Sequence, residues 1–538
     1  MYSSIKKHSI VFLMLFISFS VSCEVSDKNN IVEKSISYPV IRHKQPQPSQ
    51  TQQEISVPIS ATSPFFKQEE ISPVVSFPPL ERSLGIKKSK EIFVQSSKEI
   101  SLLEEKIGQM LIVGFRGAFI SDKGVLDIIR DIKKYHLGGV ILFDYDIALR
   151  SSKRNIQSPL QVKSLVEWLQ AASPTMPLFI AIDEEGGNIH RLKKKFGFRL
   201  ATISAQRLGW NVPILTYKHA SKIARTLSEL GINFNFAPVV DLNINTKNPA
   251  IGKLQRSFSK NPKTVTQHAL KFIEAHHEQR VLCALKHFPG HGSSKDDSHI
   301  GFVDVTNTWH KIELEPYQKI ISLGKADAIM TAHVFNRRFD EKYPATLSKN
   351  IIGGILRDRL NYEGVVVSDD MQMKAITQHY KSTSFAIQAA LKAGIDILVI
   401  GNNLEYDANI VRETVDIIRK LIKKNSQIRK QVRQSLERIE ALKKRLPQYQ
   451  QYQAIVKQKK KDNSSCRGYK KNLLTIQTTP IDSQIKLVNI KPMYQRGGLC
   501  LKPGWYAISI MHPGYWESKH WVGITDHDVF MSVTLKSK

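Results

Sequence analysis

The chain contains 538 residues, of which 78 are Lys or Arg and 48 are Asp or Glu, so its formal net charge is +30. This length accommodates a full catalytic domain together with smaller modules, and the charge indicates anionic surroundings such as a cell-wall polymer, a membrane surface or nucleic acid. The basic residues are dispersed, and none form the aromatic-interleaved basic motif of a nucleic-acid-binding protein. We therefore expect an envelope environment and no nucleic-acid partner.

The first residues have the pattern of an export signal. Two lysines, a short apolar run at 10–17 and a group of small residues predict a signal peptide over residues 1–22. The apolar run is too short to favour a membrane-spanning helix. Cys23 follows directly and resembles the lipidated cysteine of bacterial lipoproteins, although Ser20 stands where that pattern usually has Leu. Simple export and lipidation of Cys23 both stay open.

Residues 23–97 are rich in Ser, Pro, Gln and Lys and lack a sustained apolar period. This composition predicts a disordered linker. Such a spacer is long enough to hold a folded domain away from an anchor.

Residues 98–446 contain apolar runs of strand length, separated by helix-like or loop segments. Near-continuous apolar strands rich in Val and Ile suit a parallel sheet that is buried on both faces. Eight such runs predict an α/β fold, specifically a (β/α)8 TIM-type barrel. The runs are Gln109–Phe115, Gly139–Phe143, Leu178–Asp183, Phe234–Asp241, Val281–His287, Ala328–His333, Gly364–Asp369 and Asp396–Ile400.

Polar residues stand at or just beyond the carboxyl ends of these runs, where the active sites of such barrels lie. The fifth run is the most informative, because it ends in Lys286 and His287 and leads into a Gly- and Ser-rich loop that carries two more histidines and two carboxylates. The residues expected at this rim are Asp144, Asp183, Asp241, Lys286, His287, His333 and Asp369.

The segments after the last run predict helices and then a second domain. Residues 408–424 and 427–445 place apolar side chains at helical spacing, so we expect these helices to pack on the barrel. A polar stretch over 447–471 is predicted to be a linker. Residues 472–538 show short alternating runs separated by Pro and Gly, which predicts a small antiparallel all-β domain.

Three cysteines remain besides Cys23. Cys283 lies inside an apolar run and is predicted to be a core thiol. Cys466 and Cys500 flank and enter the C-terminal domain, where an exported protein could join them in a disulfide. The sequence leaves this pairing open.

Four segments together resemble glycoside hydrolase family 3, specifically its exo-β-N-acetylglucosaminidase (NagZ-like) branch. The resemblance extends over roughly residues 100 to 445, and the segments occur in the family's order on the matching strands. It implies a retaining glycosidase on a TIM-type barrel. The segments are Ile182–Gly187, Arg256–Phe258, Lys286–His299 and Val367–Met371.

The resemblance implies three catalytic residues. Asp369, at the end of the seventh run, matches the family's nucleophile, and a carboxylate below an anomeric carbon can form a covalent glycosyl-enzyme. Asp297 and His299 match the Asp-x-His pair that serves as acid/base in this branch. A His with a pKa of about 6.5 can protonate the leaving oxygen and later deprotonate water, while the Asp orients it.

Two expectations concern the geometry of these residues. Asp370 should point away from Asp369, because consecutive strand residues alternate in direction. The Gly- and Ser-rich loop that carries Asp297 and His299 should be mobile, so we expect this pair to lie away from Asp369 until substrate binds.

Substrate-binding residues are implied in the same way. Asp183, Arg256, Lys286 and His287 match the residues with which the family holds sugar hydroxyls, and charge-assisted hydrogen bonds suit that role. A salt-bridge network at the strand ends is the alternative. His333 also matches a family segment, and we include it among the substrate-binding residues.

A metal cluster is a competing interpretation of the histidine-rich loop. The spacing of His287 and His291 would suit two ligands on a helix, but Pro289 and Gly290 forbid a regular helix there. We therefore expect no metal and no cofactor, and we expect His291 to shape the loop.

The chain departs from the family pattern near the rim. Asn188 stands where Arg usually follows Glu-Gly-Gly, and Lys253–Gln255 precede Arg256 where a single acidic residue is usual. Ser259 replaces a common Gly. These differences concern the subsites beyond the first sugar and leave the catalytic residues in place.

The C-terminal region also bears on function. Family members that act on glucosides or xylosides take their acid/base Glu from a large second α/β domain, whereas only about 90 residues follow the barrel helices in this chain, so the histidine loop must supply the acid. The tail resembles a PEGA-type surface module, which implies interaction at the cell envelope. Its aromatic residues either stack on sugars or form the core of the small domain; they are Trp505, Tyr506, Tyr515, Trp516 and Trp521.

Together these features predict an exported retaining exo-β-N-acetylglucosaminidase that removes terminal β-linked GlcNAc from peptidoglycan-derived or related glycans. We expect a monomer in the periplasm or cell envelope. Whether a lipid anchors it there stays open. Two alternatives stay open. One is a catalytically inactive envelope-binding lipoprotein. The other is a phosphorylase, because a neutral His repels phosphate less than a carboxylate would.

Overall fold

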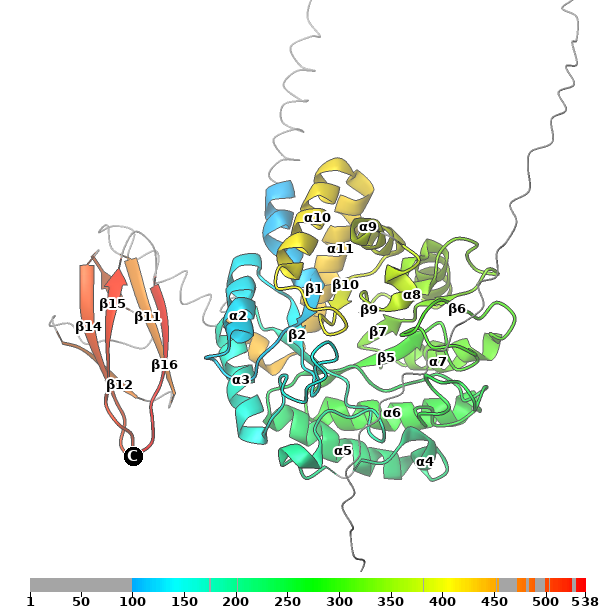
Figure 1. Ribbon diagram of the computed structural model, residues 1–538, viewed down its shortest axis with the longest axis horizontal. Coiled ribbons are helices and arrows are strands. Elements are labelled where there is room, and N and C mark those ends of the chain that lie inside the picture. Colours follow the sequence, from blue (N-terminus) through cyan, green and yellow to red (C-terminus); the bar gives the residue numbers. More distant parts are fainter. Residues whose placement is uncertain are drawn as a thin grey trace, which may run out of the picture. The chain divides into compact units, whose positions relative to one another are not determined.

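The structure is a computed structural model (Figure 1). The chain divides into the units Met1–Pro78 and Pro79–Lys538, and every described residue belongs to the second. The predicted signal peptide, the linker 23–97, Cys23, Cys466 and the side chain of Cys500 lie outside the described part. The described residues are 99–173, 176–200, 202–380, 382–450, 452–453, 472–479, 483–488, 499–502, 504–524 and 529–538.

The larger domain is a closed barrel in which every strand runs parallel to its two neighbours. Each strand falls on one of the eight predicted apolar runs, although most strands are shorter than the run, and this confirms the TIM-type barrel. In order around the barrel the strands are β1 (Leu111–Gly114), β10 (Ile397–Ile400), β9 (Val365–Asp370), β7 (Ala328–Thr331), β5 (Leu282–Phe288), β4 (Phe234–Asn235), β3 (Phe179–Ile182) and β2 (Gly139–Ile141).

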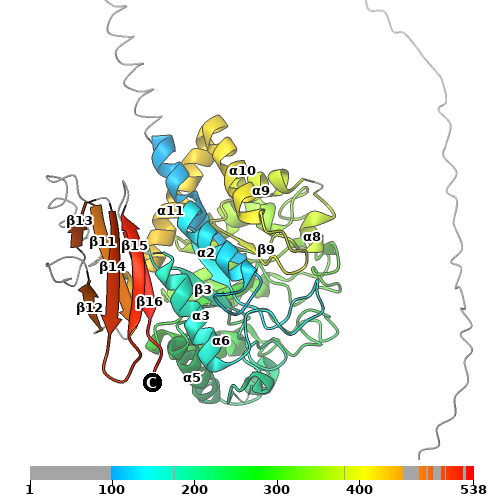
Figure 2. The ribbon, with the colours of Figure 1, turned by 60° about the vertical axis from the view of Figure 1, so that its left-hand side comes forward.

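Helices connect the strands and cover the outside of the barrel (Figures 1 and 2). Two of these helices begin with an N-cap side chain followed by a proline. Ser158 caps α3 (Pro159–Ala171) and Asn261 caps α6 (Pro262–Glu278) by accepting hydrogen bonds from backbone N–H groups. The longer helices are α2 (Lys123–Tyr135), α3 (Pro159–Ala171), α5 (Pro213–Glu229), α6 (Pro262–Glu278), α7 (Glu315–Ser322), the π-helix η5 (Asn350–Arg359), α9 (Thr383–Ala393), α10 (Ile410–Lys424) and α11 (Ser426–Lys443). The shorter ones are η1 (Ile107–Met110), η2 (Lys194–Phe196), α4 (Ala205–Gly209), η3 (Lys311–Leu314), η4 (Ala345–Leu347) and α8 (Lys374–Thr377).

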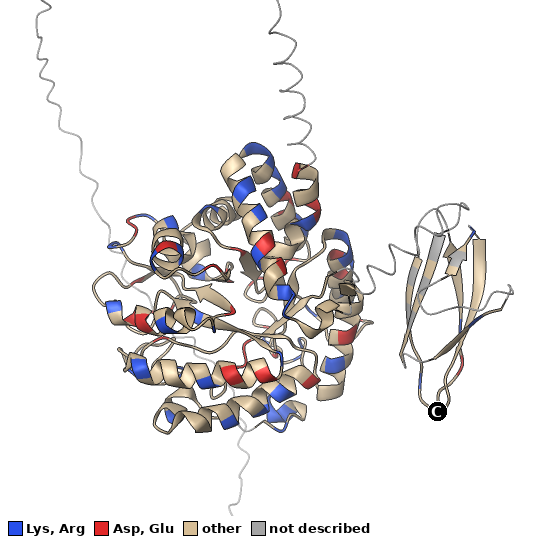
Figure 3. Ribbon diagram, turned by 180° about the vertical axis from the view of Figure 1, so that it is seen from behind, with Lys and Arg blue, Asp and Glu red and all other residues tan. Residues whose placement is uncertain are grey.

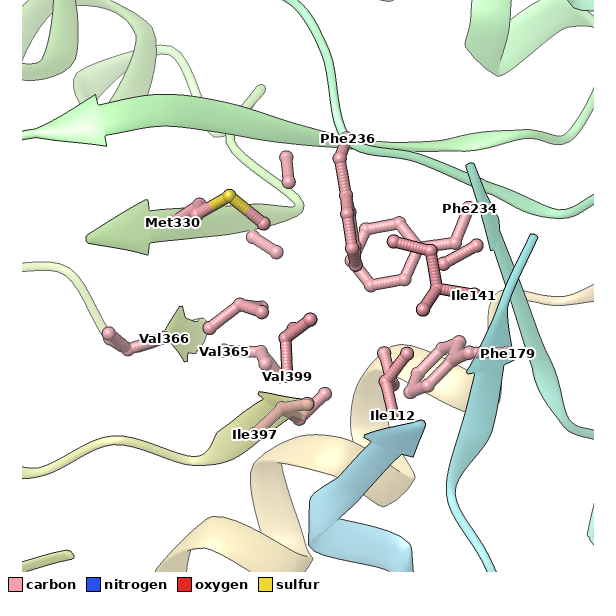
Figure 4. Packing of buried hydrophobic residues seen from close by; sticks show 14 of the residues in the cluster. Ile112, Ile141, Phe179, Phe234, Phe236, Met330, Val365, Val366, Ile397 and Val399 are labelled. Carbon is pink, nitrogen blue, oxygen red and sulfur yellow. The ribbon is translucent and has the colours of Figure 1, made fainter. Parts of the chain in front are cut away.

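The interior of the barrel is filled with apolar side chains (Figure 4). Phe234 lies 5.1 Å from both Phe179 and Phe236 between ring centroids, and all three rings are buried. Each fully buried aromatic side chain of this kind contributes about 1.5–3 kcal/mol. The barrel therefore has no central channel, and a functional site must lie at one of its ends.

The last two long helices pack on the barrel as predicted. Val415 and Ile418 of α10 and Val432 of α11 are buried in the same core as the strands. Lys443, near the end of α11, is also buried, and its Nζ donates hydrogen bonds to Gln109 Oε1 (2.7 Å) and the carbonyl oxygen of Gly138 (2.8 Å). Helix α11 is thus hydrogen-bonded to the segments that precede β1 and β2.

The predicted linker at 447–471 begins differently. Residues 447–450 and 452–453 are helical, so Pro447 opens a further turn. The Tyr452 hydroxyl donates a hydrogen bond of 2.8 Å to the carbonyl oxygen of Gln170 at the end of α3. The described start of this segment therefore belongs to the barrel.

Two short strands fix the far end of the histidine-rich loop. β6 (Val303–Asp304) follows the loop and pairs in parallel with β8 (Val334–Phe335), which follows β7. The loop is thus held at one end by β5 and at the other by this small sheet. Cys283, within β5, is a buried free thiol, as predicted.

The C-terminal region is a small all-β domain with its own core. Two three-stranded sheets contribute apolar side chains to one cluster, which includes Leu474 from one sheet and Ile508 from the other. The expected antiparallel arrangement holds for most pairs, but β11 and β16 are parallel, which corrects that expectation. The sheets are β13 (Leu499–Leu501), β11 (Asn472–Thr479), β16 (Val529–Thr534), and β12 (Gln484–Leu487), β14 (Gly504–Met511), β15 (Ser518–Ile524).

The outer helices of the barrel carry charges of both signs. Figure 3 shows Lys and Arg distributed along the outer helices with Asp and Glu between them. Among the described residues, no helix is both long enough and apolar enough to cross a membrane.

Candidate active site

A cavity of about 370 Å³ opens at the carboxyl ends of the barrel strands. It brings together seven of the eight residues predicted for catalysis and substrate binding. They come from four strands or the loops that follow them, which fits the placement of active sites in this fold. The seven are Asp183, Arg256, Lys286, His287, Asp297, His299 and Asp369.

Asp369 lies near the end of β9, and its Oδ1 accepts a hydrogen bond of 2.8 Å from the backbone N–H of Asp370. Burial raises the pKa of Asp369, but the surrounding imidazoles of His333, His287 and His299 outweigh it and leave that pKa below its ordinary value. A carboxylate that stays ionised at neutral pH can act as a nucleophile.

Asp370 differs from its neighbour. Its Oδ1 accepts hydrogen bonds from the backbone N–H groups of Gly401 (2.9 Å) and Gln372 (3.0 Å), so this carboxyl ties β9 to the loop after β10. Burial raises the pKa of Asp370 to about 6. Although Asp370 reaches the cavity edge, its carboxylate is directed at the backbone, as the alternation argument predicts.

Asp297 and His299 form a hydrogen-bonded pair on the loop after β5. Oδ1 of Asp297 lies 2.8 Å from His299 Nδ1 and also accepts the His299 backbone N–H at 2.9 Å. The hydrogen bond to His299 lowers the pKa of Asp297 to about 2. Burial lowers the pKa of His299, but the bond to Asp297 and the charge of Asp369 outweigh it and raise that pKa. Because Nδ1 is bound to Asp297, Nε2 is the nitrogen available for proton transfer.

Asp297 and His299 line the same cavity as Asp369. Among the described residues no hydrogen bond joins His299 to Asp369, so closure of the loop on substrate stays a prediction. Polar contacts hold the base of the loop. His291 lies 3.3 Å from Ser298 Oγ and 2.9 Å from Ser294 Oγ, so it supports the loop between the two catalytic residues, consistent with its expected shaping role.

An ion-pair network forms the wall beside β3 and β5. Lys286 Nζ lies 2.8 Å from Asp183 Oδ1 and 2.7 Å from Glu185 Oε1. Arg256 donates two hydrogen bonds to the carboxylate of Glu185, at 2.9 and 2.7 Å. Burial raises the pKa of Glu185, but the two cations outweigh it and hold that pKa far below its ordinary value. The network fixes charged donors at the cavity wall, where sugar hydroxyls can reach them.

His287 is oriented by a second carboxylate. Its Nδ1 lies 2.7 Å from Asp241 Oδ2, and its Nε2 lies 3.2 Å from Arg256 Nη2. In this contact the guanidinium donates and Nε2 accepts, while Nδ1 faces the Asp241 carboxylate. Both Lys286 and His287 line the cavity although they are consecutive, because the register of β5 shifts between Leu285 and Phe288.

His333 is the predicted substrate-binding residue that does not line this cavity. It is buried, with Nδ1 at 2.8 Å from Thr346 Oγ1 and Nε2 donating to the carbonyl oxygen of Asp370 at 2.9 Å. Burial lowers the pKa of His333. In this position His333 supports the backbone that carries Asp369.

Two residues of the site, Glu185 and Arg191, were not predicted from the sequence. Glu185 is two residues from Asp183 and therefore shares its direction at the end of β3, a signal that the period of a strand provides. Arg191 lines the cavity and lies 3.3 Å from Asp183 Oδ2. No strand pattern precedes Arg191, so no comparable signal marks this residue in the sequence.

Among the described residues, no group of three or more His, Cys, Asp or Glu side chains is arranged to hold a metal ion. The histidines and carboxylates of the loop bind one another and serine hydroxyls instead.

The comparison with protein families settles the affiliation. Residues 102–442 match the model of the glycosyl hydrolase family 3 N-terminal domain. The chain belongs to glycosyl hydrolase family 3. The match covers nearly the whole barrel, so the cavity described above is that of a glycoside hydrolase domain.

Related family 3 proteins are similar over the same region. The chain is 35% identical over 341 residues to β-hexosaminidase A of Pseudoalteromonas piscicida, a match that covers 59% of this chain and 55% of that protein. It is 35% identical over 283 residues to a β-hexosaminidase of Tolumonas auensis, covering 50% of this chain and 76% of that protein. The chain thus spans little more than half of the Pseudoalteromonas relative.

Solved structures agree with this relationship. A family 3 β-N-acetylglucosaminidase from Paenibacillus sp. str. FPU-7 superposes with a TM-score of 0.56 and 33% identity, over 64% of this chain and 62% of that one. A β-N-acetylhexosaminidase from Beutenbergia cavernae gives a TM-score of 0.57 and 27% identity, over 63% of this chain and 98% of that one.

Two of the departures from the family 3 pattern meet at the cavity. Asn188 Nδ2 donates a hydrogen bond of 3.2 Å to the carbonyl oxygen of Leu254, and the Leu254 side chain lines the cavity. The next residue, Gln255, has a positive φ of 57° and accepts a hydrogen bond from Ser204 Oγ. The segment Lys253–Gln255 is therefore a fixed part of the wall.

Proposed function

We propose that this protein is an exported retaining exo-β-N-acetylglucosaminidase that removes terminal β-linked GlcNAc from peptidoglycan-derived or related glycans. The observation that carries the proposal is the placement of an ionised Asp369 and a hydrogen-bonded Asp297–His299 pair on one cavity. The similarity to proteins named β-hexosaminidase and β-N-acetylglucosaminidase supports the same sugar specificity.

In the first half of the reaction, a carboxylate oxygen of Asp369 bonds to the anomeric carbon while the bond to the leaving oxygen breaks. His299 Nε2 gives its proton to that oxygen. Asp297 holds the imidazole through Nδ1 and stabilises its protonated form. The Lys286, Arg256 and Asp183 side chains bind hydroxyl groups of the sugar.

In the second half, water attacks the anomeric carbon and the bond to Asp369 breaks. The neutral Nε2 of His299 takes a proton from the water, which restores the starting state. Net retention of configuration follows, because each half inverts the anomeric carbon once.

Replacement of the proposed nucleophile tests this mechanism. Asp369→Asn should reduce turnover of an aryl β-N-acetylglucosaminide by at least about 10³-fold, because the covalent step is lost. Asp358→Asn, outside the cavity on η5, is the matched control and should retain activity. Full activity of the Asp369→Asn protein would exclude the proposal, and an inactive wild-type barrel would favour the envelope-binding alternative.

The substrate and the acceptor need separate experiments. GlcNAc-anhydroMurNAc peptides, chitobiose and an aryl glucoside, compared side by side, would identify the sugar and the linkage. Addition of inorganic phosphate distinguishes hydrolysis from phosphorolysis: free GlcNAc in both conditions supports hydrolysis, whereas GlcNAc 1-phosphate would show a phosphorylase.

Export, attachment and the envelope module form the remaining part of the proposal. Residues 1–22 would direct export, Cys23 would carry a lipid, and residues 472–538 would act as a PEGA-type module at the cell envelope. Cell fractionation of the wild type and Cys23→Ser tests the anchor. Loss of the protein from the membrane fraction in the variant supports lipidation, and unchanged release of both forms would support simple export.

A further inference from the structure

The C-terminal domain exposes three tryptophans. Trp505, Trp516 and Trp521 are 72%, 62% and 66% exposed, respectively. Tryptophan is normally buried to a large extent, and exposed large apolar side chains that lie together indicate a binding surface. The sequence left open whether these aromatic residues form the core or stack on a ligand, and their exposure excludes the core.

Strand register places two of these rings on one face. Trp505 of β14 pairs with Gly523 of β15, and Ala507 of β14 pairs with Trp521 of β15. Since directly paired residues share a face and residues two apart on a strand do too, Trp505 and Trp521 lie on the same side as diagonal neighbours, about 7–8 Å apart. The alternate residues, such as Ile508, point into the core.

The Trp505 ring packs against β15 at Gly523, where no side chain is in the way. A Cβ at Gly523 would lie 3.3–3.4 Å from three outer atoms of the Trp505 ring, so the indole rests against the β15 backbone at this glycine. The ring is held there and still exposes most of its surface. A ring fixed by the sheet loses little conformational freedom when a ligand covers it.

A row of polar residues lies beside the tryptophans on the same face. Lys486 of β12 pairs with Ser509 of β14, which pairs with Lys519 of β15. Glu517 accepts a hydrogen bond of 2.5 Å from Ser509 Oγ and lies 3.6 Å from Lys519 Nζ. With two lysines and one glutamate, the row keeps a net positive charge next to the indole rings.

We propose that the outer face of the β12–β14–β15 sheet binds an anionic polysaccharide, with sugar rings stacked on Trp505 and Trp521 and carboxylates at Lys486 and Lys519. Pyranose rings present flat C–H faces that cover an indole. The two lysines attract carboxylates of the polysaccharide beside the stacked rings. Two rings and one row form a narrow strip, which suits a linear polymer rather than the broad area that a stable protein partner requires.

This inference rests on the proposed function in one respect. A carboxylate-bearing glycan is the class of polymer from which the barrel is proposed to release GlcNAc. A surface that retains the polymer raises the effective concentration of chain ends near the enzyme. Binding and turnover are separate measurements, so the surface can be tested whether or not the barrel acts on that sugar.

The test is cosedimentation of the full-length protein with insoluble peptidoglycan. Trp505→Ala/Trp521→Ala should weaken binding by at least about tenfold, and Trp505→Tyr/Trp521→Tyr should restore most of it. Trp210→Ala is the matched control, because Trp210 is also 72% exposed but lies on the barrel. Lys486→Gln/Lys519→Gln should weaken binding to peptidoglycan and reduce its salt dependence, with less effect on neutral chitin.

Turnover of a small aryl β-N-acetylglucosaminide and the thermal unfolding midpoint should be unchanged in all these variants. Wild-type binding by the double Ala variant would overturn the proposal, as would an equal loss of binding in Trp210→Ala. Failure of the Tyr variant to restore binding in a protein that unfolds normally would also overturn it. An inactive barrel that still binds peptidoglycan through Trp505 and Trp521 would support the surface while refuting the proposed activity.

Discussion

The side-chain amide of Asn188 donates a hydrogen bond of 3.2 Å to the backbone carbonyl of Leu254. The two residues are 66 positions apart. Because Leu254 lines the cavity, the contact joins the segments after β3 and β4 at the cavity wall. We expect this wall to contact the leaving group of the substrate.

Truncation of Leu254 should affect substrate binding more than chemistry. Leu254→Ala removes part of an apolar wall worth about 1 kcal/mol, so KM for a GlcNAc disaccharide should rise about fivefold while kcat changes little. Steady-state kinetics on the disaccharide and on GlcNAc-methyl glycoside provide the measurement. Lys253→Ala is the matched control, since that side chain is exposed. An equal KM for Leu254→Ala and wild type would show that the leaving group does not touch the wall.

His299→Ala should discriminate between leaving groups. A poor leaving group needs the proton from His299, so its rate should fall by about 10²–10⁴-fold, whereas an activated aryl group should lose much less in the glycosylation step. Single-turnover kinetics with a series of aryl glycosides measure this dependence. Equal losses across the series would argue against an acid role.

The pH profile should depend on Asp297. His299 must be protonated in the first step, and its pKa is raised by the hydrogen bond to Asp297 and by Asp369, against the effect of burial. Asp297→Asn removes one of these negative charges, so the alkaline limb of kcat/KM should move to lower pH. The acid limb, which reports Asp369, should stay at low pH. A profile unchanged at high pH would mean that His299 does not set that limb.

Glu185→Gln should destabilise the barrel. Glu185 is buried between Lys286 and Arg256, and removal of its charge leaves both cations with fewer partners. The free energy of unfolding should fall by about 3 kcal/mol. Chemical denaturation at neutral pH measures the change. A loss below the error of the method would show that Asp183 alone compensates Lys286.

Ionisation of the neighbouring Glu184 should lower the stability of the fold, whereas the charge of Glu185 raises it. Burial raises its pKa to about 7, so the folded protein holds this proton more tightly than the unfolded chain does. Its contribution to stability is therefore complete below about pH 4.5 and is lost as the pH rises through 7. Glu184→Gln mimics the protonated acid and should flatten this slope at a smaller cost than Glu185→Gln. Denaturation curves between pH 5 and 8 test this, and a slope unchanged in the variant would assign the titration to another group.

The sequence alone determined the barrel and most of the site. Apolar runs without alternation suit a sheet that is buried on both faces, and eight of them separated by helix-like segments match a (β/α)8 barrel. The carboxyl ends of parallel strands meet on one rim, so Asp183, Lys286, His287 and Asp369 had to approach one another. The Asp297–His299 pair was identified through the resemblance to the family's Asp-x-His motif on the loop after the fifth run.

Only the tertiary structure decided which charges pair and which aromatic residues are exposed. The contacts of Glu185 with Lys286 and Arg256 join segments that are 101 and 71 residues apart, and periodicity carries no information about such distances. The same is true of His333, whose two ring nitrogens are bound below the cavity. Trp505 and Trp521 alternate with core residues in their strands, but only the pairing of β14 with β15 shows that they share the outer face.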